Sequence, residues 1–223
     1  MTQPKDLSRF LEVLETNGEL VRVRERVNWD GEIAEIQRHG LAETAPAILF
    51  ENIVGHENTC CRKLFVSGLA TVGRMALALG LPGDAPTGEV IARLSRAFSN
   101  PVEPVIVDSG QVKENVALGD DVDLFQFPAP KWHPDDGGRY INTWCGVVTA
   151  DPDTGEHNVG IYRGQVLSRN EIGVKLMPIK GWGKHYARYR ELGKPMPVSV
   201  FYGGDPSLGF VGGCPIPRPT EYE

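Results

Sequence analysis

The sequence predicts an α+β fold, in which an N-terminal α/β unit precedes a mainly β, barrel-like unit. Two observations support this prediction. Apolar residues recur at helical spacing, interrupted by short apolar runs, as far as Asn100-Pro101, where the composition changes. From Val105 onward the signals are mostly strands separated by proline, glycine and aspartate turns. We therefore expect two domains, at residues 1–110 and 111–223.

Helices and strands alternate in the predicted N-terminal domain. The apolar residues of segment 7–14 follow i, i+3, i+4, i+7 spacing, which is typical of an amphipathic helix, and Asn17-Gly18 ends that helix. The further elements that we expect here are a strand at 19–24, a helix capped by Asp30, strands at 47–53 and 64–69, a helix capped by Thr71 and closed by Gly80, and a helix at 86–98.

Strands dominate the predicted second domain. A hairpin loop at Asp151-Pro-Asp-Thr-Gly155 connects the first two of them. His133, Asp135 and Asp136 resemble a metal cluster, but Pro134 and the following glycines favour a polar turn. The expected elements are strands at 140–150, 157–168, 172–177 and 196–202, with a helix at 181–192.

Composition and charge narrow the classes of function. The chain has 223 residues, of which 41% are hydrophobic and 23% charged, as is typical of a globular protein. A net charge of −6 argues against nucleic acid as a partner. No apolar run is long enough for a membrane span, and the N-terminus lacks a signal-peptide core, so we expect a cytoplasmic protein. The four cysteines are not spaced as a zinc or redox motif, which predicts reduced thiols.

Several motifs occur in order along the chain. They are the stretch Asp151–Arg163, the preceding stretch Pro130–Asn142, Gly203-Gly-Asp-Pro206 and Pro215-Ile-Pro217. Together they resemble the UbiD family of reversible decarboxylases, which use prenylated flavin mononucleotide (prFMN). The resemblance covers essentially the whole chain. It implies that the second domain is a split β-barrel that binds flavin, and that the chain stops before the family's C-terminal domain.

The resemblance also implies which residues form the site. Asn158 and Glu221 would coordinate a divalent metal, with Mn²⁺ expected and K⁺ as a further candidate ion, because hard cations prefer amide and carboxylate oxygens. Arg163 would be catalytic, since its guanidinium fork suits a substrate carboxylate. The implied cofactor-binding residues are Asn158, Gly160, Ile161, Tyr162, Arg163, Lys175, Leu176, Met177, Lys180, Gly181 and Glu221.

Three features depart from a simple match. Asn158 and Arg163 are an odd number of residues apart, so a regular strand would place them on opposite faces; the strand must bulge, twist or end, and Gly160 is the expected place. Ile179 stands where family members often have a histidine, and His185 is expected to be a half-exposed helix residue rather than a ligand. Lys175 and Lys180 either pair with phosphate or are solvated lysines.

The function implied by the resemblance is reversible, non-oxidative decarboxylation of an aromatic or unsaturated acid, in which prFMN carries the bond cleavage. The proton-donating acid of the family lies beyond residue 223, so we expect an incomplete enzyme that works as a homo-oligomer or with a second chain. One alternative is a non-catalytic cofactor-binding subunit of a larger carboxylase or decarboxylase assembly. Another is a flavin reductase on a split barrel. The substrate and the direction of reaction stay open.

Overall fold

The strand β2 (Ala47–Phe50) is the centre of the N-terminal unit, and all four of its residues are buried. The computed structural model describes residues 2–102, 105–179 and 181–214. In this structure β1 (Leu20–Val23) pairs with β2 in parallel, and β3 (Leu64–Val66) pairs with β2 in the antiparallel direction. The expected strands at 19–24, 47–53 and 64–69 are therefore present but shorter.

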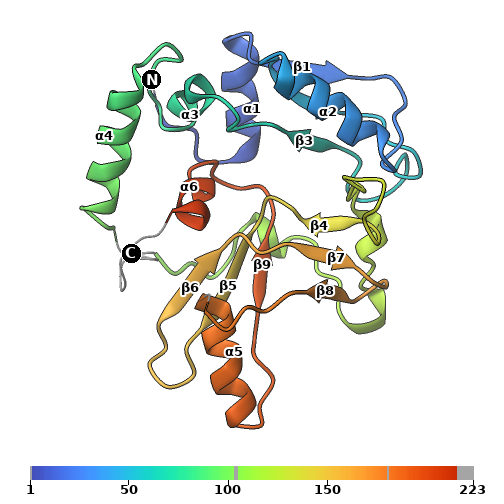
Figure 1. Ribbon diagram of the computed structural model, residues 1–223, viewed down its shortest axis with the longest axis vertical. Coiled ribbons are helices and arrows are strands. Elements are labelled where there is room, and N and C mark those ends of the chain that lie inside the picture. The colour runs from blue at the N-terminus through green and yellow to red at the C-terminus, as the bar shows by residue number, and fades with distance from the viewer. Residues whose placement is uncertain (1, 103–104, 180, 215–223) are drawn as a thin grey trace.

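Helices pack on both faces of this sheet because successive residues of β2 point to opposite sides. Ala47 lies in one apolar cluster with Phe10 and Leu77, whereas Ile48 and Phe50 lie in a second cluster with Ile33. The helices of the first face are α1 (Leu7–Thr16), α3 (Val72–Ala78) and α4 (Thr87–Phe98), and the helix of the second face is α2 (Glu32–Ala42), as Figure 1 shows.

Helix caps follow the sequence with one exception. The side chain of Thr71 accepts a hydrogen bond of 3.2 Å from the Arg74 amide, as expected of an N-cap. The prediction that Asp30 caps α2 is wrong, because Gly31 occupies the N-cap and no side chain bonds there. The Glu32 carboxylate instead accepts a 2.7 Å bond from the Asn28 amide, which fixes the chain ahead of the helix.

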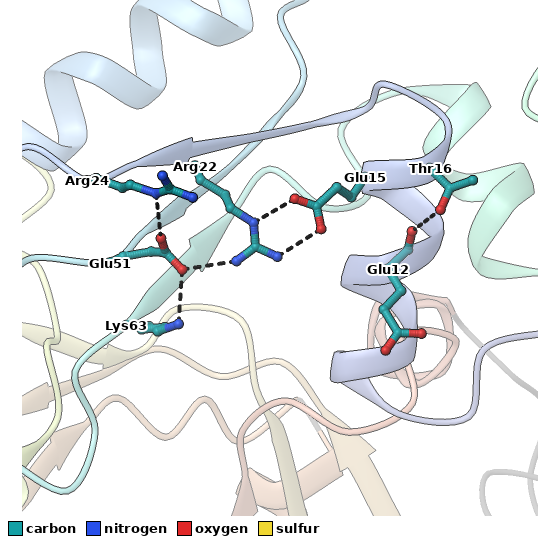
Figure 2. Close-up of polar contacts among 7 residues, drawn as sticks. All are labelled: Glu12, Glu15, Thr16, Arg22, Arg24, Glu51 and Lys63. Carbon is teal, nitrogen blue, oxygen red and sulfur yellow. Dashed lines mark hydrogen bonds and ion pairs between the residues drawn. The ribbon is translucent and has the colours of Figure 1, made fainter.

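An ion-pair network ties α1 to the sheet (Figure 2). Arg22 on β1 donates two hydrogen bonds, of 2.7 and 2.9 Å, to the Glu15 carboxylate and a third, of 3.0 Å, to Glu51. Glu51 also accepts a 2.9 Å bond from Lys63 and lies near Arg24. The Lys63 ammonium, helped by Arg22, holds the pKa of Glu51 below its usual value, although partial burial acts in the opposite direction.

The second unit contains two three-stranded sheets, with the strand orders β4-β7-β8 and β6-β5-β9 (Figure 1). Within the described residues these two sheets do not close into the expected barrel. Their strands are β4 (Tyr140–Asn142), β5 (Gly146–Ala150), β6 (His157–Gly160), β7 (Gly164–Val166), β8 (Ile172–Val174) and β9 (Ser199–Phe201).

The chain passes from one sheet to the other through a short loop at two points, so the single strands predicted at 140–150 and 157–168 are each divided, and it crosses a third time through α5 between β8 and β9. Residues 143–145 separate β4 from β5, and residues 161–163 separate β6 from β7. The two passages contact each other, since the Cys145 sulfur lies 3.9 Å from the carbonyl oxygen of Tyr162. An apolar alternation reads the same on either side of such a passage, so periodicity did not indicate either one; the second follows Gly160, where the odd spacing of Asn158 and Arg163 had predicted an interruption.

Two helices complete the second unit. The expected helix at 181–192 is α5 (Gly181–Glu191), which packs against β5 and β6. The short helix α6 (Leu208–Gly213) places Phe210 in the N-terminal cluster that contains Phe10, so the two units share apolar packing. Single 3₁₀ turns occur at Gln111–Lys113, Gly119–Asp121 and Leu124–Gln126.

The predicted turns and thiols are confirmed. The Asp136 carboxylate accepts hydrogen bonds from the amides of Trp132 and His133, so this segment is a polar turn. In the hairpin, the Asp151 carboxylate accepts bonds from two following amides. All four cysteines are free. Over the described part of the chain, no helix has the length and apolar character of a membrane span.

Glu51→Gln is expected to lower the free energy of unfolding by about 1–3 kcal/mol at pH 7, because Arg22 and Lys63 lose a charged acceptor. The folded-state pKa of Glu51 is depressed, so its contribution is fully present above the unfolded pKa of about 4.3 and is lost as pH falls through the folded value. Urea unfolding at pH 7 and pH 3 should therefore show a difference between variant and wild type that shrinks in acid.

Glu12→Gln, on an exposed pair with Arg9, is the control and should change stability by less than about 1 kcal/mol. A difference for Glu51→Gln that does not decrease as the pH is lowered until this carboxyl is protonated contradicts the assignment.

Candidate functional site

Asn158 lies on β6 opposite Thr149 of β5, and its side chain faces the start of α5. The residue is only 4% exposed. Its Oδ1 accepts a 3.3 Å hydrogen bond from the Tyr162 hydroxyl. A Cβ added to Gly181 would lie 1.2 Å from the same oxygen, so the first residue of α5 has to be glycine for the helix to approach this closely. The asparagine oxygen is thus held between a phenol and a helix N-terminus.

Tyr162 folds back over its own strand. A Cβ added to Gly160 would lie 2.6 Å from the Tyr162 ring, so the planar ring that approaches this backbone is the tyrosine. The Tyr162 ring also stacks on the ring of Trp182, with 4.2 Å between the ring centroids and 3° between the ring planes. Trp182 is buried with Cys145 and Val147. Sequence reasoning missed Trp182, although glycines on either side of it signal close packing of its backbone.

The segment 175–177 borders the first turn of α5. A Cβ added to Gly183 would lie 2.0 Å from the carbonyl oxygen of Met177, so this glycine also allows a close backbone approach. Leu176 packs against the buried cluster that contains Trp182, while the side chains of Lys175 and Met177 are exposed. The segment therefore contributes one apolar anchor and two residues at the surface of the site.

Arg163 is exposed in the passage between β6 and β7. The strand β6 ends at Gly160, and this ending, rather than a bulge within the strand, accommodates the odd spacing from Asn158 to Arg163. Ile161 is half-buried against Gly212 of α6. Arg163 makes no ion pair with another described residue. Lys180 and Glu221 lie outside the described residues.

His185 was expected to be half-exposed, and this prediction is wrong. The residue is on α5 as expected, but it is only 1% exposed, and its Nδ1 lies 2.9 Å from the Thr149 hydroxyl. Position 185 is one helical turn after Gly181, so both lie on the face of α5 that packs against β5 and β6. The i, i+4 relation to that glycine is the signal that could have indicated burial. Ile179, by contrast, is 75% exposed.

Burial also sets the ionisation of two side chains near the passages between the sheets. The loss of water around Cys145 raises the pKa of its thiol to about 11. Burial likewise raises the pKa of Tyr202, whose hydroxyl donates a 2.5 Å hydrogen bond to the buried Asn142 amide oxygen. Both groups stay protonated at neutral pH, so they stabilise the packing around the site without adding charge to it.

The arrangement suits an anionic group better than it suits a metal alone. Exposed cations at Lys175 and Arg163 border the site, and the N-terminus of α5 presents backbone amides, which favours a phosphate. The oxygen donor in place for a hard cation is the Asn158 amide. The residues from 2 to 214 that the structure describes contain no cluster of three His, Cys, Asp or Glu residues that could hold a metal. A metal here would therefore need Glu221 or a ligand oxygen.

Comparison with known proteins places both units in one family. The profile described as the 3-octaprenyl-4-hydroxybenzoate carboxy-lyase N-terminal domain (UbiD_N) matches residues 11–94. The profile described as the 3-octaprenyl-4-hydroxybenzoate carboxy-lyase Rift-related domain (UbiD) matches residues 105–223. These two matches leave only short segments of the chain unassigned.

Individual relatives agree with the profiles. A phenolic acid decarboxylase of Sedimentibacter hydroxybenzoicus is 34% identical over 230 residues, which are 98% of this chain and 47% of the relative. The open form of the vanillic acid decarboxylase from the same organism has a TM-score of 0.87 at 32% identity, over 100% of this chain and 47% of that chain. The UbiD-class enzyme HmfF of Pelotomaculum thermopropionicum, solved with prFMN in an evolved dimeric form, has a TM-score of 0.81 at 27% identity, over 94% of this chain and 47% of that chain. The chain thus spans about half the length of these relatives.

Gly181→Ala should displace α5 from Asn158, because the added methyl group and the amide oxygen cannot occupy the same space. We expect a loss of about 1–3 kcal/mol in the free energy of unfolding, with a weakened near-ultraviolet circular dichroism signal from Trp182. Gly88→Ala on α4 meets no atom within 4 Å and is the matched control, which should be neutral or stabilising by up to about 1 kcal/mol. Equal stability of both variants would contradict the close contact.

Cys145 should resist alkylation in the folded protein, because it is buried and its pKa is about 11. At pH 8 the thiolate fraction at that pKa is on the order of one in a thousand. Iodoacetamide followed by peptide mass spectrometry should modify the exposed Cys60 and Cys214 first, and denaturant should remove the difference. Modification of Cys145 at the rate of Cys60 without denaturant would show that the site opens readily.

Proposed function

We propose that this chain, which belongs to the UbiD family, supplies the cofactor-binding half of a reversible, non-oxidative decarboxylase of an aromatic or unsaturated carboxylic acid. The observation that carries the proposal is that three segments of the chain meet: residues 158–162, residues 175–177 and the first turn of α5. Asn158, the ring of Tyr162 and the first turn of α5 at Gly181 are in direct contact, and the loop 175–177 borders the same turn. The family resemblance assigns cofactor contacts to each of these segments.

We assign the groups of a bound prFMN to these segments by their chemistry. Lys175, the α5 amides and Lys180 would face its phosphate, with Gly181 allowing the helix to lie close. Asn158 and Glu221 would share a divalent metal, for which Mn²⁺ is our choice. The residues Ile161, Leu176 and Met177 would line the ring system. When bound, the cofactor supplies the electron sink for loss of carbon dioxide.

Arg163 would bind the substrate carboxylate. Its guanidinium is exposed and has no ion-pair partner among the described residues, so its donors are available to an incoming acid. Its place in the passage between β6 and β7 puts it next to Tyr162 and thus beside the cofactor segments. Orientation of the carboxylate is the contribution that this residue makes to catalysis; the acid that returns a proton would come from the remaining half of a family-length protein.

A vanillic or phenolic acid is the substrate class that these relatives favour, since they are vanillic and phenolic acid decarboxylases. We also propose the division into domains 1–110 and 111–223, which the profile matches at 11–94 and 105–223 support. A split barrel would require the sheets β4-β7-β8 and β6-β5-β9 to be completed by further strands. The alternative, a non-catalytic cofactor-binding subunit, uses the same site and differs only in the absence of turnover in the complete assembly.

Titration of the purified chain with prFMN, with and without Mn²⁺, tests the proposal. We expect saturable binding, followed by flavin absorbance, that tightens with Mn²⁺. Asn158→Ala should weaken the Mn²⁺-dependent part at least about 10-fold, because it removes a metal ligand. Asn170→Ala, an exposed asparagine in the turn before β8, is the control and should bind like wild type.

Two results would contradict the proposal. One is the absence of binding by a chain that melts cooperatively. The other is binding that Asn158→Ala leaves unchanged while Arg22→Ala, far along the chain in the N-terminal ion-pair network, abolishes it.

A further inference from the structure

Trp144 is the most exposed of the four tryptophans of the chain. It is 57% exposed, whereas Trp29 and Trp132 are half-buried and Trp182 is buried. An exposed apolar side chain is ordinary on its own, so its neighbours decide what this one means. Those neighbours place it in the passage at residues 143–145, beside the candidate site.

Trp144 lies across from Arg163, because two contacts bring the two passages together. On one side of the pair, Asn142 and Gly164 are strand partners in β4 and β7. On the other side, the Cys145 sulfur lies 3.9 Å from a carbonyl oxygen of the second passage. The residues between these two contacts are therefore neighbours, and both Trp144 and Arg163 are exposed there.

The helix α6 fixes the edge of the Trp144 ring. A Cβ added to Gly209 would lie 2.3 Å from Cζ2 of this ring, so the contact requires glycine. Three residues later, a Cβ added to Gly212 would lie 2.9 Å from Cγ1 of Ile161 in the second passage. Positions i and i+3 share one face of a helix, so one face of α6, which lies between the two units in Figure 1, receives side chains from both passages.

Hydrogen bonds hold the chain directly before Trp144. The Thr143 hydroxyl accepts a 2.8 Å bond from the indole N–H of Trp132 and donates a 2.9 Å bond to the Tyr140 carbonyl oxygen. The Thr143 amide donates a 3.0 Å bond to the carbonyl oxygen of Ile141. Because its ring edge and the preceding residue are both restrained, Trp144 would lose little conformational freedom on binding a ligand.

A restrained indole beside a guanidinium can contact both parts of an aromatic acid. The Arg163 fork has donors for the carboxylate. The indole of Trp144 has apolar area and a π face for a second ring, in offset-stacked or edge-to-face geometry. An unsaturated acid without a ring would use the arginine alone, so the pair would favour aromatic acids.

We propose that Trp144 is a specificity-determining residue, which contacts the ring of an aromatic acid while Arg163 binds the carboxylate. The inference rests on the proposed function for the role of Arg163. It goes further in assigning the choice between aromatic and other unsaturated acids to one side chain. The other planar group that could occupy this place is the flavin itself, and the experiment separates the two.

Binding of two acids tests the proposal. The probes are vanillate, which has an aromatic ring, and crotonate, an unsaturated acid without one. Each is titrated into the full chain by equilibrium dialysis, with and without prFMN and Mn²⁺. Trp144→Ala should weaken vanillate binding about 3- to 10-fold, the range expected for loss of one ring–ring contact, and change crotonate binding less than about twofold. Trp144→Phe should restore most of the vanillate affinity, and Arg163→Ala should weaken both acids alike.

Two controls distinguish ring contact from general damage. Gly209→Ala keeps the indole but displaces it, so vanillate binding should weaken at least about twofold, whereas Gly213→Ala, whose added Cβ meets no atom within 4 Å, should bind like wild type. Tyr186→Ala removes an aromatic side chain of 42% exposure from α5 and should also bind like wild type. Thermal melts of all the variants check that each is folded.

Three results would overturn the proposal. They are the absence of saturable vanillate binding in both states, an equal loss for the two acids in Trp144→Ala, and weaker prFMN binding by Trp144→Ala, since the ring would then contact the flavin. The prFMN titration tests the proposed function separately. A chain that binds prFMN without ring selectivity keeps the proposed function and loses this inference, and ring-selective binding by a chain that takes up no prFMN does the reverse.

Discussion

The passage of the chain between two sheets, at residues 143–145 and 161–163, is the constraint on which the rest of the second unit depends. The two passages touch through Cys145 and the Tyr162 carbonyl. Because β6 ends at Gly160, Asn158 stays on the buried face of one sheet while Arg163 emerges at the surface between the sheets. In the proposed function, this ending would allow an amide and a guanidinium five residues apart to serve one ligand.

The helix α5 completes that arrangement from the other side. Gly181 and Gly183 let its backbone approach Asn158 and the Met177 carbonyl, and the buried pair of His185 and Thr149 fixes the helix one turn further along. Thr149 and Asn158 are cross-strand partners, so the contacts of α5 converge on neighbouring positions of one strand pair. A buried, hydrogen-bonded polar cluster restrains its side chains, which would suit the proposed cofactor site.

Sequence reasoning predicted most local features and missed the non-local ones. The helices at 7–16 and 181–191 follow from apolar spacing and glycine signals, and the Asp151 hairpin from its turn residues. Periodicity within a strand does not reveal to which sheet it belongs, so the passage at 143–145 and the open arrangement of the sheets were not predicted, whereas an interruption at Gly160 was expected from the odd spacing of Asn158 and Arg163. The burial of His185 and the stacking of Tyr162 on Trp182 depend on partners 36 and 20 residues away; the glycines at 181 and 183 signal close packing there but do not identify those partners.

A crystal structure of the chain with prFMN and Mn²⁺, with the metal located by anomalous scattering, is the most direct measurement of the central claim. The account predicts a manganese peak within bonding distance of Asn158 Oδ1 and a phosphate at the first turn of α5. A cofactor bound elsewhere, such as in the groove between α1 and the N-terminal sheet lined by Leu11, Arg22 and Lys63, would contradict it.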